Sequence, residues 1–136
     1  MTGLPPLFPV GRIRSSIGKP DDAPHQGREA GIEAAVEILP EYEEALEGIE
    51  GCRRIVIVCW LHLAGRSTLK VHPRGDPGKP LTGVFATRSP LRPNPLAIYT
   101  AELLEVRGTT LLVRGVDAVD GTPVIDIRPH APRLDD

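Results

Sequence analysis

Short apolar runs alternate with polar stretches rich in glycine and proline along the whole chain. The continuous β-branched run in residues 55–61 indicates a strand buried on both faces. Two longer apolar runs flank Gly108, which predicts a hairpin with a tight turn. The expected strands are residues 8–15, 32–39, 54–63, 82–86, 96–106, 110–116 and 124–127.

The segments between these strands predict one helix and two long loops. Residues 40–48 begin with proline, carry acidic residues in the first turn and end at glycine, which is typical of a short helix. Residues 16–31 and 64–81 have no apolar period, and long loops in compact domains tend to be functional or mobile. No βαβ alternation occurs, so a doubly wound nucleotide fold is disfavoured. The predicted fold class is mostly β: a small antiparallel β-barrel with one short helix and long loops, because a closed sheet has no edges to protect.

Composition narrows the choice of function. A length of 136 residues favours one domain, expected over residues 8–132, with flexible termini at 1–7 and 133–136. The net charge of −2 gives no global field for nucleic acid, so a polyanion would need a local basic patch. Two cysteines without Cys/His metal spacing predict neither a disulfide framework nor a metal site. No apolar run is long enough for a membrane span, which predicts a cytoplasmic protein.

Two loops carry opposite charges at the ends of predicted strands. In residues 83–95, Arg88 follows a strand on a loop stiffened by proline, where its guanidinium can bind a carboxylate or a phosphate. It can equally be a solvated surface arginine. Asp117 and Asp120 precede a Gly-Thr-Pro turn, which predicts either an Asx-stabilised turn or carboxylates directed at the same ligand. A zwitterionic ligand would satisfy both loops.

Two histidines are weaker candidates for a functional role. His62 ends the 54–63 strand, and a histidine in that position is by default a satisfied core residue. His25 lies in a polar loop, where an exposed histidine is usually only solvated. Clefts at strand ends are nevertheless where ligands bind.

Four motifs together resemble a known family. They are Gly-Val-Phe-Ala-Thr-Arg-Ser-Pro-x-Arg-Pro-Asn-Pro at 83–95, Asp-x-x-Asp-Gly-Thr-Pro-Val-x-Asp-Ile-x-Pro at 117–129, Val-Gly-Arg-Ile-Arg-Ser at 10–15 and Pro-His-Gln-Gly at 24–27. They are similar to the TsaA-like (TrmO) family of β-barrel, S-adenosylmethionine-dependent tRNA methyltransferases, over about residues 8–132. The resemblance implies a homodimer that methylates N6 of threonylcarbamoyladenosine beside the anticodon of tRNA.

The same resemblance implies a set of contacts to S-adenosyl-L-methionine. The implied residues are Pro24, His25, Gln26, His62, Leu63, Arg88, Ile98, Arg114, Gly115, Val116 and Asp117. Ala97 and Tyr99 stand where the family usually has glycine and serine, which adds bulk beside this pocket. Longer members of the family also carry an additional C-terminal domain, which we do not expect in a chain of 136 residues.

The catalytic base and the tRNA contacts are further expectations. His62 or Asp120 is the candidate for removing the N6 proton. The expected tRNA contacts are Lys70 and Arg74 on a basic arm, which also holds Arg66 and Lys79, and Arg92 and Asn94 on the neighbouring loop. Two alternatives remain open, namely a methyltransferase of a smaller acceptor and a non-catalytic S-adenosylmethionine sensor.

Overall fold

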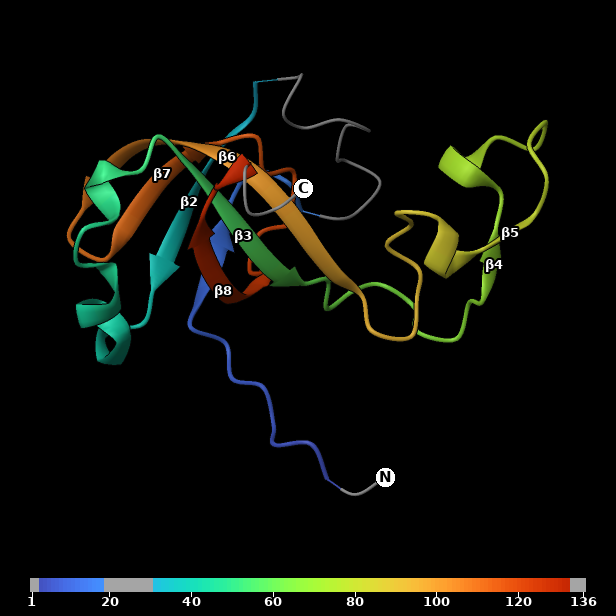
Figure 1. Cartoon of the computed structure of the whole chain (residues 1–136), viewed down its shortest axis with the longest axis horizontal. Helices are drawn as coiled ribbons and strands as arrows, with labels where there is room; N and C mark the ends of the chain where they lie inside the picture. Colours follow the sequence, from blue (N-terminus) through green and yellow to red (C-terminus); the bar gives the residue numbers. More distant parts are fainter. Residues whose placement is uncertain (1–2, 19–30, 133–136) are drawn as a thin grey trace.

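Six antiparallel strands close into a barrel, which confirms the predicted fold class (Figure 1). The computed structural model describes residues 3–18 and 31–132. The order around the barrel is β1-β2-β7-β6-β3-β8. The strands are β1 (Gly11–Arg14), β2 (Glu33–Ile38), β3 (Arg54–Trp60), β6 (Leu96–Arg107), β7 (Thr110–Arg114) and β8 (Pro123–Pro129).

The core fills the barrel with alternate side chains of each strand. In β3, Ile55, Ile57 and Cys59 are fully buried, whereas Val56 and Val58 on the opposite face are half-buried. The predicted burial of this strand on both faces is therefore wrong. β-branched residues suit a pleated strand on either face, so a continuous run of them does not require a second covering layer.

Bulges let the strands bend around the core. The register of β6 against β7 shifts between Leu103 and Glu105, so Leu104 is an extra residue in the longest strand. A second shift between Val58 and Cys59 of β3 leaves Ile125 of β8 without an opposite residue. Such bulges increase the local bend and twist that barrel closure requires.

The turn between β6 and β7 matches its prediction. Gly108 has a φ of 58°, a left-handed conformation that glycine adopts without steric cost. The hairpin therefore forms where the sequence placed it.

At Gly11, β1 leaves no room for a side chain against β2. A Cβ added at Gly11 would lie 2.3 Å from the carbonyl oxygen of Glu37 on β2. The other side of β1 closes the barrel against β8 through only two residue pairs, Gly11 with Val124 and Arg12 with Pro123. This seam joins the first and the last strand of the described chain.

Residues 61–95, called the arm from here on, project from one side of the barrel (Figure 1). They contain a two-stranded sheet of β4 (Lys70–Val71) and β5 (Thr82–Gly83), and the 3-10 helices η4 (Pro73–Gly75) and η5 (Val84–Ala86). The strand predicted over 82–86 is thus wrong in its length, since only Thr82 and Gly83 form a strand, which pairs with β4 within the arm. Exposed apolar side chains are concentrated here, namely Leu63, Leu69, Leu81, Phe85 and Leu91.

The predicted short helix is confirmed as the 3-10 helix η2 (Pro40–Leu46), followed by η3 (Ile49–Gly51). Tyr42, Leu46 and Ile49 pack from these helices against the core. Within the part of the chain that is described, no helix is long and apolar enough to cross a membrane.

Candidate ligand-binding end of the barrel

The end of β3 and the beginning of β6 lie side by side. Trp60 is opposite Leu96, and the Leu61 amide donates to the Pro95 carbonyl at 2.8 Å. His62 follows directly and is exposed, so the default interpretation of His62 as a core residue is wrong. Its ring has no hydrogen-bond partner among residues 3–18 and 31–132, which leaves it free for a ligand.

Apolar side chains surround this position. Leu63 is 55% exposed and Ile98, on the outer face of β6, is 57% exposed. Ile98 lies opposite Val58, so the two side chains share the outer face of the barrel. An apolar surface of this kind can take the uncharged parts of a ligand.

The chain leaving β7 brings Asp117 to the same end of the barrel. Arg114 lies opposite Glu102 of β6, and β7 runs antiparallel to β6, so the next residues extend towards Tyr99. Gly115 and Val116 are buried on the way, and the Gly115 amide donates to the Ile32 carbonyl at 2.8 Å. These contacts fix the backbone that presents Asp117.

Tyr99 is the neighbour of Asp117 that the sequence did not reveal. Burial, followed by the negative charge of Asp117 and its hydrogen bonding, raises the pKa of the Tyr99 hydroxyl well above its usual value. The hydroxyl therefore stays protonated beside the carboxylate. From the sequence, Tyr99 was interpreted only as added bulk. Tyr99 lies three residues before Glu102, and Asp117 lies three residues after its partner Arg114, so the register of the hairpin could have placed the two side chains together.

Arg114 has a partner within the protein. Its Nη1 lies 3.2 Å from Oε1 of Glu102 on the neighbouring strand. The ion pair reduces the positive charge that Arg114 can offer to a ligand.

Arg92 holds the loop before β6 together from within. Its Nη2 donates to the Thr87 carbonyl at 2.7 Å and to the Val84 carbonyl. Its Nε is buried without a hydrogen-bond partner in the described part of the chain. Because the guanidinium faces the loop carbonyls, these contacts indicate a structural role, and the predicted tRNA contact of Arg92 stays a prediction.

Arg66 holds the other half of this loop. Its Nε donates to the Pro93 carbonyl at 2.6 Å, its Nη2 donates to Oδ1 of Asn94 at 3.0 Å, and its guanidinium carbon lies 5.0 Å from the centre of the Trp60 ring. The sequence carried a signal for both arginines. Pro90, Pro93 and Pro95 have no N–H, so the loop has fewer backbone donors than carbonyl acceptors and needs side-chain donors.

Arg88 is the arginine of this loop that remains free. Its side chain is exposed and makes no ion pair or hydrogen bond with the described residues. The backbone on either side is ordered by local contacts, since the Ser89 amide donates to Oγ1 of Thr87 at 3.2 Å. A free guanidinium on a fixed loop is suited to bind an anion.

Asp120 is engaged by β1. Its Oδ1 accepts a hydrogen bond from the Ser15 amide at 3.0 Å, and its Oδ2 lies 3.7 Å from Nη1 of Arg14. These contacts fit the structural interpretation of the turn, and a role for Asp120 as a base stays a prediction.

Lys70 and Arg74 are both exposed on the arm. The arm is braced nearby by a contact of 2.8 Å between Nδ1 of His72 and the Lys79 carbonyl.

Pro24, His25 and Gln26 lie outside the described residues. No group of three or more His, Cys, Asp or Glu side chains that could hold a metal ion occurs in residues 3–18 and 31–132.

Comparison with protein families gives one match over nearly the whole chain. Residues 12–136 match the family described as the tRNA-methyltransferase O N-terminal domain. A "Probable S-adenosyl-L-methionine-binding protein" of Methanothermobacter thermautotrophicus is 49% identical over 129 residues, which are 95% of this chain and 92% of that protein. An "S-adenosyl-L-methionine-binding protein" of Archaeoglobus fulgidus is 42% identical over 129 residues, 95% of this chain and 91% of that protein.

Solved structures are similar in fold and in sequence. The crystal structure of TrmO from Pseudomonas aeruginosa matches with a TM-score of 0.79 and 33% identity, over 99% of this chain and 59% of that chain. A second crystal structure, described as TrmO, matches with a TM-score of 0.78 and 31% identity, again over 99% of this chain and 59% of that one. The chain therefore spans about three fifths of the length of the TrmO chains that it resembles.

Proposed function

The chain belongs to the family of the tRNA-methyltransferase O N-terminal domain, and on this premise we propose that it is an S-adenosylmethionine-dependent methyltransferase. Its proposed acceptor is N6 of threonylcarbamoyladenosine next to the anticodon of tRNA. The observation that carries the proposal is the family match over residues 12–136, together with relatives named for binding S-adenosyl-L-methionine. The free guanidinium of Arg88 supports it from the structure.

The side chains at this end of the barrel, together with Arg88 on the arm, match the chemical groups of S-adenosylmethionine in type. Its carboxylate suits Arg88, which has no partner among the described residues, and its ammonium and ribose hydroxyls suit the Asp117 carboxylate. The exposed side chains of Leu63 and Ile98 offer apolar surface to the rest of the molecule. Each group of the cofactor thus has a matching type of side chain here.

The cofactor supplies an activated methyl group, which the acceptor nitrogen takes as the carbon–sulfur bond breaks. For the protein, the principal task is to hold the acceptor nitrogen about 3–3.5 Å from the methyl carbon, in line with that bond. The proton on N6 must also leave. His62 is exposed and has no hydrogen-bond partner in the described part of the chain, so it is better suited than Asp120, whose carboxylate is engaged by Ser15 and Arg14.

The proposal includes a homodimer that acts on tRNA in the cytoplasm. Leu69, Leu81 and Phe85 are between 56% and 86% exposed on the arm, a surface that a second copy of the chain can cover. Lys70 and Arg74 on the same arm are exposed and have no ion-pair partner among the described residues, so they can meet RNA phosphates.

Mass spectrometry of tRNA nucleosides tests the function. A host strain without the methylated nucleoside should gain it when the wild-type chain is expressed, and should not gain it with Arg88→Ala. In vitro, labelled methyl from S-adenosylmethionine should appear in total tRNA.

Two outcomes would contradict the proposal. Label found only in small molecules indicates a smaller acceptor. Cofactor binding without any label transfer indicates a sensor.

A further inference from the structure

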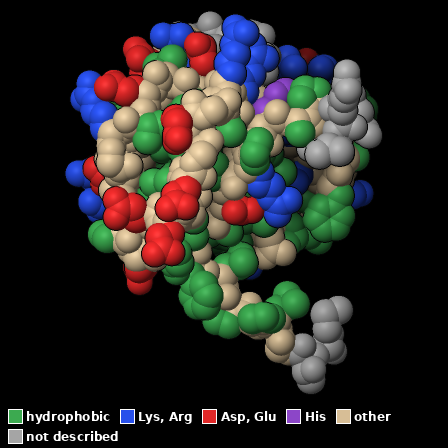
Figure 2. Space-filling view, turned by 60° about the vertical axis from the view of Figure 1, so that its left-hand side comes forward, with side chains coloured by type: hydrophobic (Ala, Val, Ile, Leu, Met, Phe, Trp, Pro, Cys, Tyr) green, Lys and Arg blue, Asp and Glu red, His purple; other side chains and the backbone are tan. Residues whose placement is uncertain are grey.

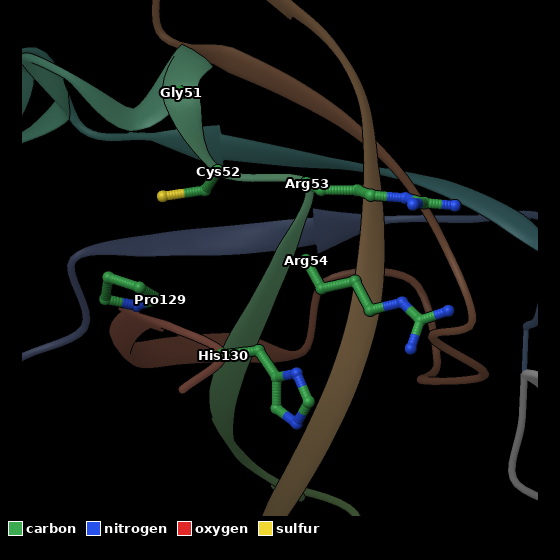
Figure 3. A pocket seen from close by; sticks show the side chains of 6 residues that line it. All are labelled: Gly51, Cys52, Arg53, Arg54, Pro129 and His130. Carbon is green, nitrogen blue, oxygen red and sulfur yellow. The ribbon is translucent and has the colours of Figure 1, made fainter. Parts of the chain in front are cut away.

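A concavity of about 490 Å³ lies at the opposite end of β3 from His62 (Figure 3). It opens where β3 begins and β8 ends, and the His130 amide donates to the Arg54 carbonyl at 3.1 Å across this junction. We call it the basal pocket. Its lining residues are Gly51, Cys52, Arg53, Arg54, Pro129 and His130.

The lining of the basal pocket carries positive charge without a carboxylate. Neither Arg53 nor Arg54 forms an ion pair or side-chain hydrogen bond within the described residues. Figure 3 shows their side chains extending in the same direction, with the His130 ring beside Arg54. Two guanidinium groups and an imidazole in one concavity form a set of donors for an anion.

Among the described residues, the acidic side chains adjacent to this pocket in the sheet or in the sequence do not pair with its arginines. Glu102 lies opposite Arg54 in the sheet, but its carboxylate accepts the hydrogen bond from Arg114 at 3.2 Å. Asp126 on β8 is paired with Arg128 at 2.9 Å. Glu50, the nearest acidic residue in sequence, is exposed and pairs with neither pocket arginine. Neither pocket arginine therefore has a carboxylate partner among the described residues.

We propose that the basal pocket binds a backbone phosphate of the RNA substrate. This inference rests on the proposed function and adds a second contact region to it. Arg53 and Arg54 bind the phosphate oxygens, and His130 donates a further hydrogen bond.

The form of the pocket favours a polymer over a small ligand. Small-molecule sites are enclosed and mostly apolar, whereas Gly51, Arg53, Arg54 and Pro129 are all exposed at the rim of this one. An open, polar concavity suits a chain that passes across it.

The position of the pocket also indicates that its ligand is a polynucleotide. Arg54 and Trp60 both lie on the outer face of β3, six residues apart, which corresponds to about 20 Å at the rise of a strand. A ligand as small as the cofactor cannot reach from one to the other. A folded polynucleotide can contact the pocket while its modified base lies near His62.

The test compares two double variants of the full chain with the same change in net charge. Arg53→Ala/Arg54→Ala removes the pocket cations, whereas Arg12→Ala/Arg107→Ala removes two arginines that are ion-paired with Glu37 and Glu105. We expect the pocket variant to bind unmodified tRNA about tenfold more weakly. We also expect its slope of log K against log salt to fall by roughly 0.7–0.9, the value for the loss of one phosphate contact.

A steric variant gives an independent measurement. A Cβ at Gly51 would meet nothing within 4 Å, so Gly51→Leu can extend into the pocket without changing its charge. It should also weaken tRNA binding. Affinity for S-adenosylmethionine, measured by calorimetry, should be unchanged in all these variants.

Three results would overturn the inference. Equal tRNA affinity in the pocket variant and the control variant would show that the pocket does not bind RNA and would leave the proposed function intact. Pyrophosphate binding that is lost in the pocket variant, with tRNA binding retained, would assign the pocket to a small phosphate ligand. A wild-type chain that binds no tRNA at low salt would reject both the pocket assignment and the proposed substrate.

Discussion

Arg88 and Arg92 lie four residues apart in one loop and have opposite environments. The Arg92 guanidinium is held by the carbonyls of Val84 and Thr87, whereas Arg88 is exposed without a partner among the described residues. Each therefore predicts a different result when it is replaced.

Replacing Arg88 by alanine should weaken S-adenosylmethionine binding and leave the fold unchanged. Loss of a charge-assisted hydrogen bond costs about 1.5–3 kcal/mol, which is more than tenfold in affinity. Calorimetry measures the dissociation constant, and Arg107→Ala serves as the control because Arg107 is paired with Glu105. Unchanged affinity in Arg88→Ala would remove Arg88 from the site.

Replacing Arg92 by alanine should instead loosen the loop. The Thr87 carbonyl loses the donor from Arg92, and the Val84 carbonyl keeps only its hydrogen bonds from Thr87, including one from Oγ1 at 3.0 Å. We expect a loss of stability of about 1–3 kcal/mol. Hydrogen exchange of the amides in residues 84–94 should accelerate, as measured by mass spectrometry.

Arg92→Lys tests the geometry of this contact. It keeps the charge but lacks the planar fork, so it should restore little of the protection. Normal exchange in Arg92→Ala would contradict the structural role.

Cys59 makes stability depend on pH in the alkaline range. Burial raises the pKa of its thiol from 9.0 to about 12. Below pH 9 the thiol is protonated in both the folded and the unfolded state, whereas between pH 9 and 12 only the unfolded state releases the proton. Stability should therefore fall as pH rises through this window, by about 1.4 kcal/mol at one unit above pH 9.

Urea unfolding between pH 8 and 10 measures this dependence. Cys59→Ala should have lower stability throughout and a flatter pH profile, whereas Cys52→Ala retains the buried thiol and the slope. A wild-type profile that is flat to pH 10 would be inconsistent with a titrating thiol in the core.

At the scale of the elements, the sequence predicted a helix or a turn best where residues next to each other in the chain determine its structure. Gly108 between two apolar runs predicted the β6–β7 hairpin, and proline and glycine around residues 40–48 predicted the short helix. The 82–86 strand was wrong because its partner, β4, has only two residues and no apolar pattern. A pairing of that kind depends on a long-range contact that periodicity does not record.

The candidate site was predictable in its residue types but not in its contacts. Arg88, His62 and Asp117 were named from the sequence, and His62 and Asp117 lie at one end of the barrel. The contacts of Arg66 and Arg92 with the loop were missed, although the three prolines of the loop indicated a need for side-chain donors. That signal does not identify which arginine supplies each donor, because the pairing depends on how the loop is folded in space.

Gly11→Ala should destabilise the barrel through β1 and β2. The added Cβ would lie 2.3 Å from the Glu37 carbonyl oxygen, a backbone atom that cannot move independently of β2. We expect a loss of about 1–3 kcal/mol or more, measured by urea unfolding. Gly18→Ala is the control, since a Cβ there meets nothing within 4 Å. Equal stability of the two variants would show that β1 and β2 can move apart at Gly11 without a loss of folding free energy.

At the scale of the whole molecule, charge and apolar surface are distributed differently. Acidic and basic side chains are interspersed on the body of the protein (Figure 2), in agreement with a net charge of −2. Most of the large exposed apolar side chains lie instead on the arm and on the N-terminal segment, where Leu4 is 84% exposed, and Ile98 is the most exposed one on the barrel.

Replacing Phe85 by aspartate should shift the proposed homodimer towards monomer. Phe85 is 86% exposed on the arm, and a buried charge at an interface costs several kcal/mol. Light scattering at micromolar concentration should show a dimer for the wild type and a reduced mass for the variant, with an unchanged circular dichroism spectrum. Leu4→Asp, on the other projecting segment, should remain dimeric. A monomeric wild type that binds the cofactor fully would exclude a shared site.

The seam between β1 and β8 determines when this protein can finish folding. Gly11 pairs with Val124, so more than 100 residues must leave the ribosome after β1 before the barrel can close. At about 5–20 residues per second, β1 waits for roughly 6–20 s with one edge unpaired. Contacts this distant in sequence also slow the folding step itself. During synthesis the exposed edge of β1 is therefore a point at which a chaperone or another nascent chain can bind.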